Sequence, residues 1–94
     1  MHYLDFNNDG LEDVLVEFSA RNSEGGTFYF LVAVLFENIE KKYIYKAHFQ
    51  PENLLFEEFS QAFFIFSGTA NRFSEEITTK KYKLVNNTFI ENYQ

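Results

Sequence analysis

The sequence predicts a mainly β fold: a single domain over residues 1–94, arranged as an antiparallel meander of about five or six strands. Several segments alternate apolar and polar residues with a period of two, which is typical of half-buried strands. The four Gly and the single Pro lie between apolar segments, where turns are expected. The connections are too short for the crossover that parallel strands need, so we expect antiparallel pairing.

The first half of the chain predicts three strands. In residues 14–18, Val14, Val16 and Phe18 would share one face of a strand, and Leu15 and Glu17 would share the other. Residues 28–36 are nine consecutive hydrophobic residues, mostly β-branched or aromatic, which favours a strand buried on both faces. Residues 43–49 alternate again and predict a half-buried strand. The polar segments 20–26 and 38–42 are expected to form the turns between these strands.

The segment 51–62 permits two interpretations, which the sequence leaves open. Leu55, Phe59 and Ala62 stand at helical spacing, so a short helix would make the fold α+β. Phe56 would widen the apolar face of such a helix, so an irregular link or a strand is equally compatible with the pattern.

The rest of the chain predicts three more strands. Residues 63–67 are strongly apolar, and residues 77–85 alternate after a polar loop at 68–75. Asn86 and Asn87 are then expected to form a tight turn into a closing strand at 88–93.

Composition excludes several classes of protein. Fourteen acidic residues against eight basic ones give a net charge of −6, which argues against a nucleic-acid partner. A hydrophobic share of 46% argues against disorder, and no apolar run is long enough to span a membrane. The absence of Cys excludes disulfides and thiolate metal sites. The first residues show no signal peptide, so we expect a cytoplasmic chain or a mature segment.

Residues 5–13 have the spacing of a calcium loop, which leads into the β domain predicted over residues 14–94. Oxygen-bearing side chains stand at loop positions 1, 3, 5 and 9, and Gly10 stands at position 6, where a sharp turn is needed. Calcium prefers such oxygen ligands, and position 7 contributes its backbone carbonyl. The predicted Ca2+ ligands are therefore the side chains of Asp5, Asn7, Asp9 and Asp13 and the carbonyl of Leu11.

The distribution of acidic residues supports a metal site. All three Asp residues of the chain lie in this loop, whereas ten of the eleven Glu residues lie outside it. The same residue types also favour tight turns, so a turn without metal is the alternative. Val16 occupies position 12, where an EF-hand has a bidentate Glu, and Glu17 follows one residue late. We therefore expect weak affinity, in the ~10⁻⁴ to 10⁻³ M range of extracellular modules.

The loop and the strand after it resemble the calcium loop of FG-GAP and VCBS repeats, over about fifteen residues. A wider resemblance is to small bacterial exported proteins of uncharacterised function, through residues 25–29 (GGTFY) and 79–84 (TKKYKL). The resemblance implies a periplasmic or extracellular domain with a structural calcium loop and no known activity. Such proteins usually carry a leader, and often a Cys pair where this chain has residues 71–74. This sequence shows neither feature, and these two differences bear most on the predicted periplasmic or extracellular location.

These observations predict a non-enzymatic, calcium-stabilised β domain. Neither His2 nor His48 stands in a recognisable catalytic order, and adjacent residues such as Glu57 and Glu58 face opposite ways on a strand. The alternative is an acidic interaction module, such as an inhibitor or immunity-type binder, with an unidentified protein partner and no role for metal. Nineteen aromatic residues exceed what one small sheet buries, which leaves a ligand groove or a homodimer face open.

Overall fold

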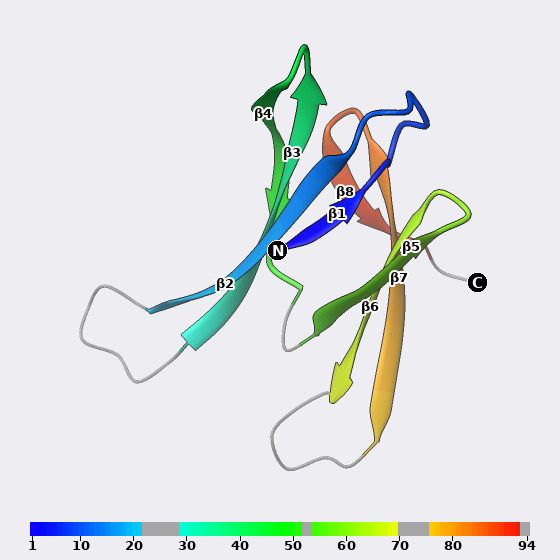
Figure 1. The fold of residues 1–94 in the computed structure, drawn as a ribbon. Coiled ribbons are helices and arrows are strands. Elements are labelled where there is room, and N and C mark those ends of the chain that lie inside the picture. Colours follow the sequence, from blue (N-terminus) through cyan, green and yellow to red (C-terminus); the bar gives the residue numbers. More distant parts are fainter. Residues whose placement is uncertain (22–28, 52–53, 70–75, 93–94) are drawn as a thin grey trace.

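The chain forms two four-stranded antiparallel sheets (Figure 1). The computed structural model describes residues 1–21, 29–51, 54–69 and 76–92, and these residues contain no helix. Sheet A has the order β1-β2-β3-β4 and sheet B the order β5-β6-β7-β8, so each sheet is a meander. The strands are β1 (His2–Leu4), β2 (Asp13–Arg21), β3 (Tyr29–Ile39), β4 (Lys42–Phe49), β5 (Leu55–Ser60), β6 (Phe63–Thr69), β7 (Ile77–Val85) and β8 (Thr88–Glu91).

The predicted antiparallel β class is confirmed, and the helix considered for residues 51–62 does not form where the structure describes that segment. β5 occupies it instead. Its register shifts between Phe56 and Glu58, so Glu57 is an extra residue in the ladder. Phe56 and Phe59 therefore both pair with inward-facing phenylalanines of β6 although they are three residues apart. Of the three residues at helical spacing, Leu55 is exposed on β5 and Ala62 lies in the exposed turn after it, so they do not form one buried face.

Strand β1 is the other element beyond the five or six expected. Its three residues are too few to show a period, and it exists because it pairs with the start of β2. The register joins His2 to Leu15 and Leu4 to Asp13. The predicted loop segment 1–13 thus contains a strand before the loop itself.

Three two-residue turns connect neighbouring strands. The predicted turn at Asn86 and Asn87 is confirmed, with φ of 51° and 62°. Gln61 and Ala62 connect β5 to β6 with φ of 54° and 68°. Glu40 and Lys41, which connect β3 to β4, have the same left-handed conformation, so the expected turn at 38–42 is shorter than its polar sequence indicates. Positive φ at both central residues is typical of type I′ hairpin turns.

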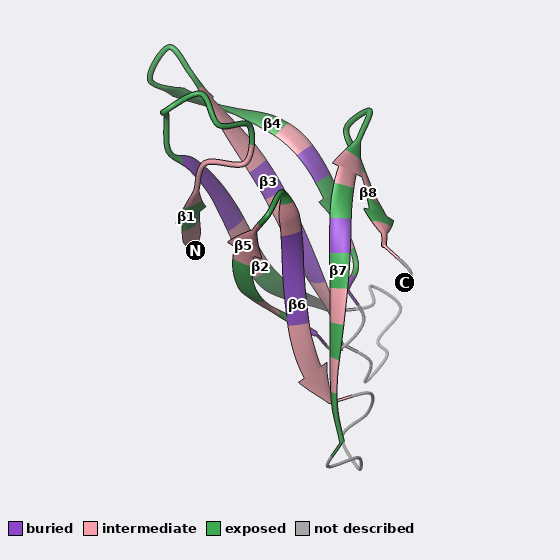
Figure 2. Cartoon of the chain, turned by 90° about the vertical axis from the view of Figure 1, so that its right-hand side faces the viewer, coloured by how far each residue is buried: buried purple, intermediate pink, exposed green. Residues whose placement is uncertain are grey.

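The core lies between the two sheets (Figure 2). Sheet A contributes small and aliphatic side chains, whereas sheet B contributes mainly aromatic ones. Phe49 of β4 stacks on Phe89 of β8 with ring centroids 4.5 Å apart, which joins the sheets along one edge. The buried members of the core are Leu15, Ala33, Leu35, Leu54, Phe64, Phe66 and Tyr82.

Strand β3 differs from the expectation of burial on both faces. Ala33 and Leu35 point inward and are fully buried. On the outer face, Val32 is buried, but Val34 and Phe36 are partly exposed. Burial inside the core therefore does not by itself account for the continuous apolar run, because the described residues leave Val34 and Phe36 partly exposed on the outer face.

Parts of five sequence predictions lie outside the described residues: positions 22–26 of the first hairpin connection, position 28 of the apolar strand, positions 52–53 of the segment 51–62, positions 70–75 of the loop before β7, and Tyr93 of the closing strand. Among the described residues, none belongs to a helix that could cross a membrane.

Candidate metal site

The loop of the candidate site connects β1 to β2. Because these strands pair antiparallel with Leu4 opposite Asp13, the two ends of the loop are held side by side. Asp5 follows β1 and Asp13 begins β2. Residues 8 to 10 turn the chain between them, with φ of 57° at Asn8 and 84° at Gly10. The strand pairing alone thus brings the first and last predicted ligands together.

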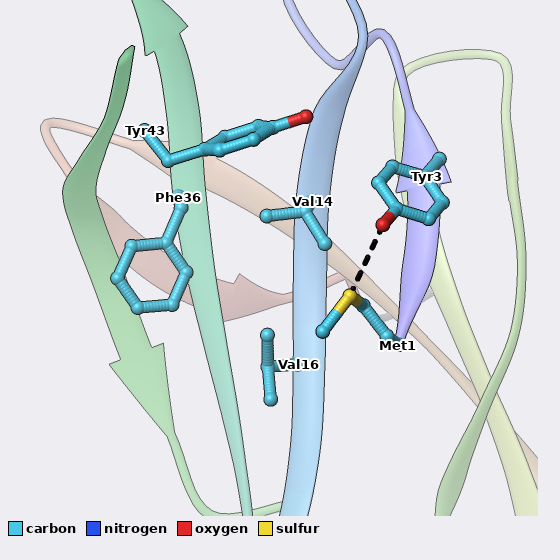
Figure 3. A pocket seen from close by; sticks show the side chains of 6 residues that line it. All are labelled: Met1, Tyr3, Val14, Val16, Phe36 and Tyr43. Atoms are coloured by element: carbon cyan, nitrogen blue, oxygen red, sulfur yellow. Dashed lines mark hydrogen bonds between the residues drawn. The ribbon is translucent and has the colours of Figure 1, made fainter.

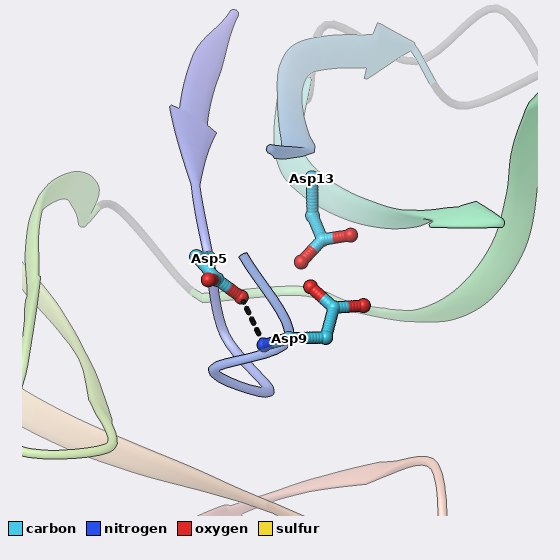
Figure 4. Close-up of side chains that lie close together, drawn as sticks. All are labelled: Asp5, Asp9 and Asp13. Carbon is cyan, nitrogen blue, oxygen red and sulfur yellow. Dashed lines mark hydrogen bonds between the residues drawn. The ribbon is translucent and has the colours of Figure 1, made fainter. Parts of the chain in front are cut away.

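Asp5, Asp9 and Asp13 converge on one point (Figure 4). One carboxylate oxygen from each residue lies within 4.8 Å of the other two. Two oxygens that each lie 2.3–2.6 Å from a shared calcium ion can be up to about 5 Å apart. The separation of the three carboxylates is therefore compatible with a single calcium ion between them.

Hydrogen bonds donated by backbone N–H groups hold the carboxylates of Asp5 and Asp9 in place. The backbone N–H of Gly10 donates to Oδ2 of Asp5 (2.8 Å) and that of Asp9 donates to Oδ1 (3.2 Å). Desolvation raises the pKa of Asp5, but these donors together outweigh it and hold the pKa below its ordinary value. Asp9 in turn accepts from the backbone N–H of Leu11 at 2.8 Å. The loop therefore favours the ionised form of Asp5.

Asp13 is the buried member of the cluster, with 0% of the residue exposed. Its Oδ1 accepts from the backbone N–H of Asn38 (2.7 Å) and its Oδ2 from that of Phe6 (3.3 Å). Burial raises the pKa of Asp13 above its ordinary value, and the negative charges of Asp9 and Asp5 raise it further against those two donors. A cation at this position would relieve both costs.

No family model, curated protein or solved structure matches this chain. The resemblance to FG-GAP and VCBS loops therefore stays a prediction from the sequence.

The other two predicted ligands are placed differently. The side-chain amide of Asn7 donates from Nδ2 to Oε2 of Glu37 at 3.0 Å, and Oε1 of Glu37 lies 3.3 Å from Nζ of Lys46. This contact attaches the loop to β3 and β4. Leu11 is 43% exposed, and its carbonyl remains a ligand by prediction only. The structure thus brings together three of the four predicted side chains, and the fourth fastens the loop to the sheet.

Two residues at the end of β3 border the loop and were not predicted from the sequence. Besides Glu37, Asn38 donates from Nδ2 to the carbonyl of Glu12 at 3.2 Å, and its own N–H binds Asp13. Its Oδ1 is buried and has no hydrogen-bond partner among the described residues. No local pattern in the sequence marks these two residues as neighbours of the loop. The β2–β3 register, which pairs Val14 with Phe36, places them beside it.

Neither residue near EF-hand position 12 can complete the loop from its present place. Val16 points to the outer face of sheet A. Glu17 points inward, where its Oε2 accepts from the N–H of Phe56 (2.8 Å) and its Oε1 lies 2.5 Å from Nε2 of His2. Glu17 thus connects the two sheets. His48, the other histidine, is hydrogen bonded to Tyr45 on β4.

Proposed function

We propose that residues 5–13 bind one Ca2+ ion and that this ion stabilises the β domain without taking part in catalysis. The observation that carries the proposal is the convergence of Asp5, Asp9 and Asp13, at the spacing of a calcium loop, on a region small enough for one ion. The Asp13 carboxylate adds weight, because it is buried beside two other acids.

The proposed role is structural because the loop ties three strands together. Asp5 and Asp13 stand at the adjoining ends of β1 and β2. Asp13 is hydrogen bonded to Asn38 at the end of β3. An ion between these carboxylates would replace their mutual repulsion with attraction and would hold β1 in place. A strand of three residues, as β1 is, has few ladder hydrogen bonds of its own.

The ligand count supports weak binding and, with it, an exported location. Three carboxylates with backbone and water oxygens can satisfy calcium, but the bidentate acid of an EF-hand is lacking, since Val16 and Glu17 are directed elsewhere. Affinity of about 10⁻⁴ to 10⁻³ M suits extracellular calcium concentrations. We therefore propose a periplasmic or extracellular location, in agreement with the resemblance to exported bacterial domains.

A thermal melt of the whole chain tests the proposal. Tm is measured by circular dichroism with excess calcium chloride and with chelator, and calcium binding is titrated by calorimetry. At 100 times Kd, calcium should add about 2.7 kcal/mol, which corresponds to a rise in Tm of roughly 10–20 °C for a domain of this size. Equal melting temperatures in calcium and chelator would contradict the proposal. Magnesium provides a control for unspecific screening of the acidic loop.

The alternative, an acidic interaction module in which metal is irrelevant, gives a different result in the same experiment. Its melting temperature would not depend on calcium. Its complex with a basic partner would weaken steeply with salt and would survive Asp9→Ala.

A further inference from the structure

The outward-facing surfaces of the two sheets differ in chemistry. The outer face of sheet B carries charged residues such as Glu58, which pairs with Ile65, and Lys81, which pairs with the same residue from the other side. On the outer face of sheet A, the described positions that pair in the ladder carry no Asp, Glu, Lys or Arg side chain. Lys46, the unpaired residue where the β3–β4 register shifts, forms an ion pair with Glu37. This outer face consists of Tyr3, Val14, Val16, Phe18, Val32, Val34, Phe36, Asn38, Tyr43, Tyr45 and His48.

The outer face of sheet A is also hollowed (Figure 3). A cavity of about 310 Å³ opens over β1, β2 and β3, and its floor is formed by valines of β2. The rings of Tyr3, Phe36 and Tyr43 stand around it, and the hydroxyl of Tyr3 donates to Sδ of Met1 at 3.2 Å. Such a hollow is large enough to take an aromatic side chain from a facing surface.

The exposed apolar area of this face is close to what a stable dimer needs. Tyr3, Phe18, Tyr43 and Tyr45 are 55%, 47%, 50% and 55% exposed. Since an aromatic side chain has roughly 150–250 Å² of surface, these four leave about 300–500 Å² accessible, and the partly exposed Val16, Val34 and Phe36 add to it. A standard interface buries about 800 Å² per partner, of which about 65% is apolar in homodimers, or roughly 500 Å².

We propose that the outer face of sheet A packs against the same face of a second copy of this chain in a two-fold symmetric dimer. Two sheets can pack face to face about 10 Å apart with their strand directions within about 30° of each other. A face without charges is complementary to itself, because no charged group would be buried unpaired, whereas it offers no feature that would select a charged partner. Rings of one copy would fill the hollow of the other.

The proposed dimer is independent of the calcium site. The acidic loop lies beyond one end of the outer face, so a two-fold axis perpendicular to the strands would place the two loops at opposite ends. That arrangement keeps the negative charges of the two copies apart. Salt should therefore leave the dimer intact or strengthen it, which distinguishes it from an electrostatic complex.

Sedimentation equilibrium of the whole chain tests the proposal directly. We expect a mass of about twice 11.2 kDa at about 100 μM protein, both in calcium and in chelator. Tyr43→Glu should raise the dimer dissociation constant about tenfold or more, because it would place an unpaired charge in the interface. The matched control is Ile90→Glu, which adds the same charge at a residue 48% exposed that pairs with Lys83 on the outer face of sheet B. Circular dichroism verifies that both variants are folded.

Thiol labelling maps the interface in a chain that has no native Cys. Tyr45→Cys should react more slowly as the protein concentration rises through the dimer dissociation constant, whereas Ile90→Cys should react at a constant rate. Protection of both positions would place the interface elsewhere and overturn the proposal. A monomeric mass at every protein concentration would also overturn the proposed dimer. If that monomer bound a hydrophobic dye and Tyr43→Glu abolished the binding, the occupant of this face would be a different apolar partner.

Discussion

The substitution Asp9→Asn should change the stability of the domain in opposite directions with and without calcium. Asp9 is exposed and contributes one of the three converging carboxylates. An Asn side chain keeps the oxygen that accepts from the N–H of Leu11 and removes only the negative charge. The variant therefore separates the electrostatic cost of the cluster from its value as a ligand set.

The expected gain in chelator follows from the geometry. One oxygen from each of the three carboxylates lies within 4.8 Å of the other two. Like charges this close repel one another, and salt at about 0.15 M screens part of the repulsion. Asp9 lies beside both Asp5 and Asp13, so removing its charge should raise the free energy of unfolding in chelator. Tm should rise by a few degrees at most, because solvent screens charges near the surface and 1 kcal/mol corresponds to roughly 4–8 °C in a domain of this size.

In calcium, the loss of one charged ligand acts the other way. If affinity falls tenfold, a calcium concentration of 100 times the wild-type Kd stabilises the variant by about 1.4 kcal/mol instead of about 2.7 kcal/mol. The calcium-induced rise in Tm should therefore be about half that of the wild-type chain. Calorimetric titration should show the same loss of affinity.

The assay compares four melts, of wild type and Asp9→Asn in calcium and in chelator. Glu57→Gln removes one negative charge from an exposed residue of β5 and provides the control, since its calcium response should equal that of the wild type. A variant that is less stable than wild type in chelator, or that keeps the full calcium response, would refute the reasoning.

Three further predictions concern the ionisation of Asp13, the contact of Glu17 between the sheets, and the turn between β5 and β6. Calcium binds the ionised carboxylate of Asp13, and the pKa of this carboxyl is raised. As the pH falls from about 7 to 4, the calcium-induced rise in Tm should therefore disappear at a higher pH than it would if Asp13 had the ordinary pKa of an Asp. Thermal melts across this pH range measure the effect. Glu17→Ala should lower the free energy of unfolding in urea by about 1–3 kcal/mol, because the N–H of Phe56 loses its partner between the sheets; an unchanged value would mean that water replaces the carboxylate. Ala62→Gly should raise the free energy of unfolding by about 1 kcal/mol, because Ala62 has a φ of 68°, which Gly adopts without steric cost. Ala47→Gly, at a buried strand position, should lower the free energy of unfolding and serves as the control.

Much of the fold follows from the sequence because strand periodicity is local. Alternating segments and polar turns locate β2, β4, β6, β7 and β8 to within a few residues, and the apolar run locates β3. The order of side-chain types in residues 5–13 likewise indicates a loop whose carboxylates converge, and three of them do converge. These inferences succeed because each depends on residues close together in the chain.

The remaining features depend on residues far apart in the chain and could not be derived locally. The bulge at Glu57 interrupts the strict alternation expected of a strand in β5, and the three residues of β1 are recognised as a strand only by their pairing with β2. The partners of the loop, Glu37 and Asn38, are some thirty residues away and reach it through the β2–β3 register.

The apolar run of β3 shows the same division between local and tertiary information. Its composition determines that both faces of the strand avoid water. Among the described residues, sheet B packs against one face of sheet A, and this packing decides which face of β3 lies in the core. The preference of a side chain for burial depends on its residue type alone, so the sequence determines it. Which groups cover that side chain depends on how the two sheets pack, so only the tertiary structure decides it.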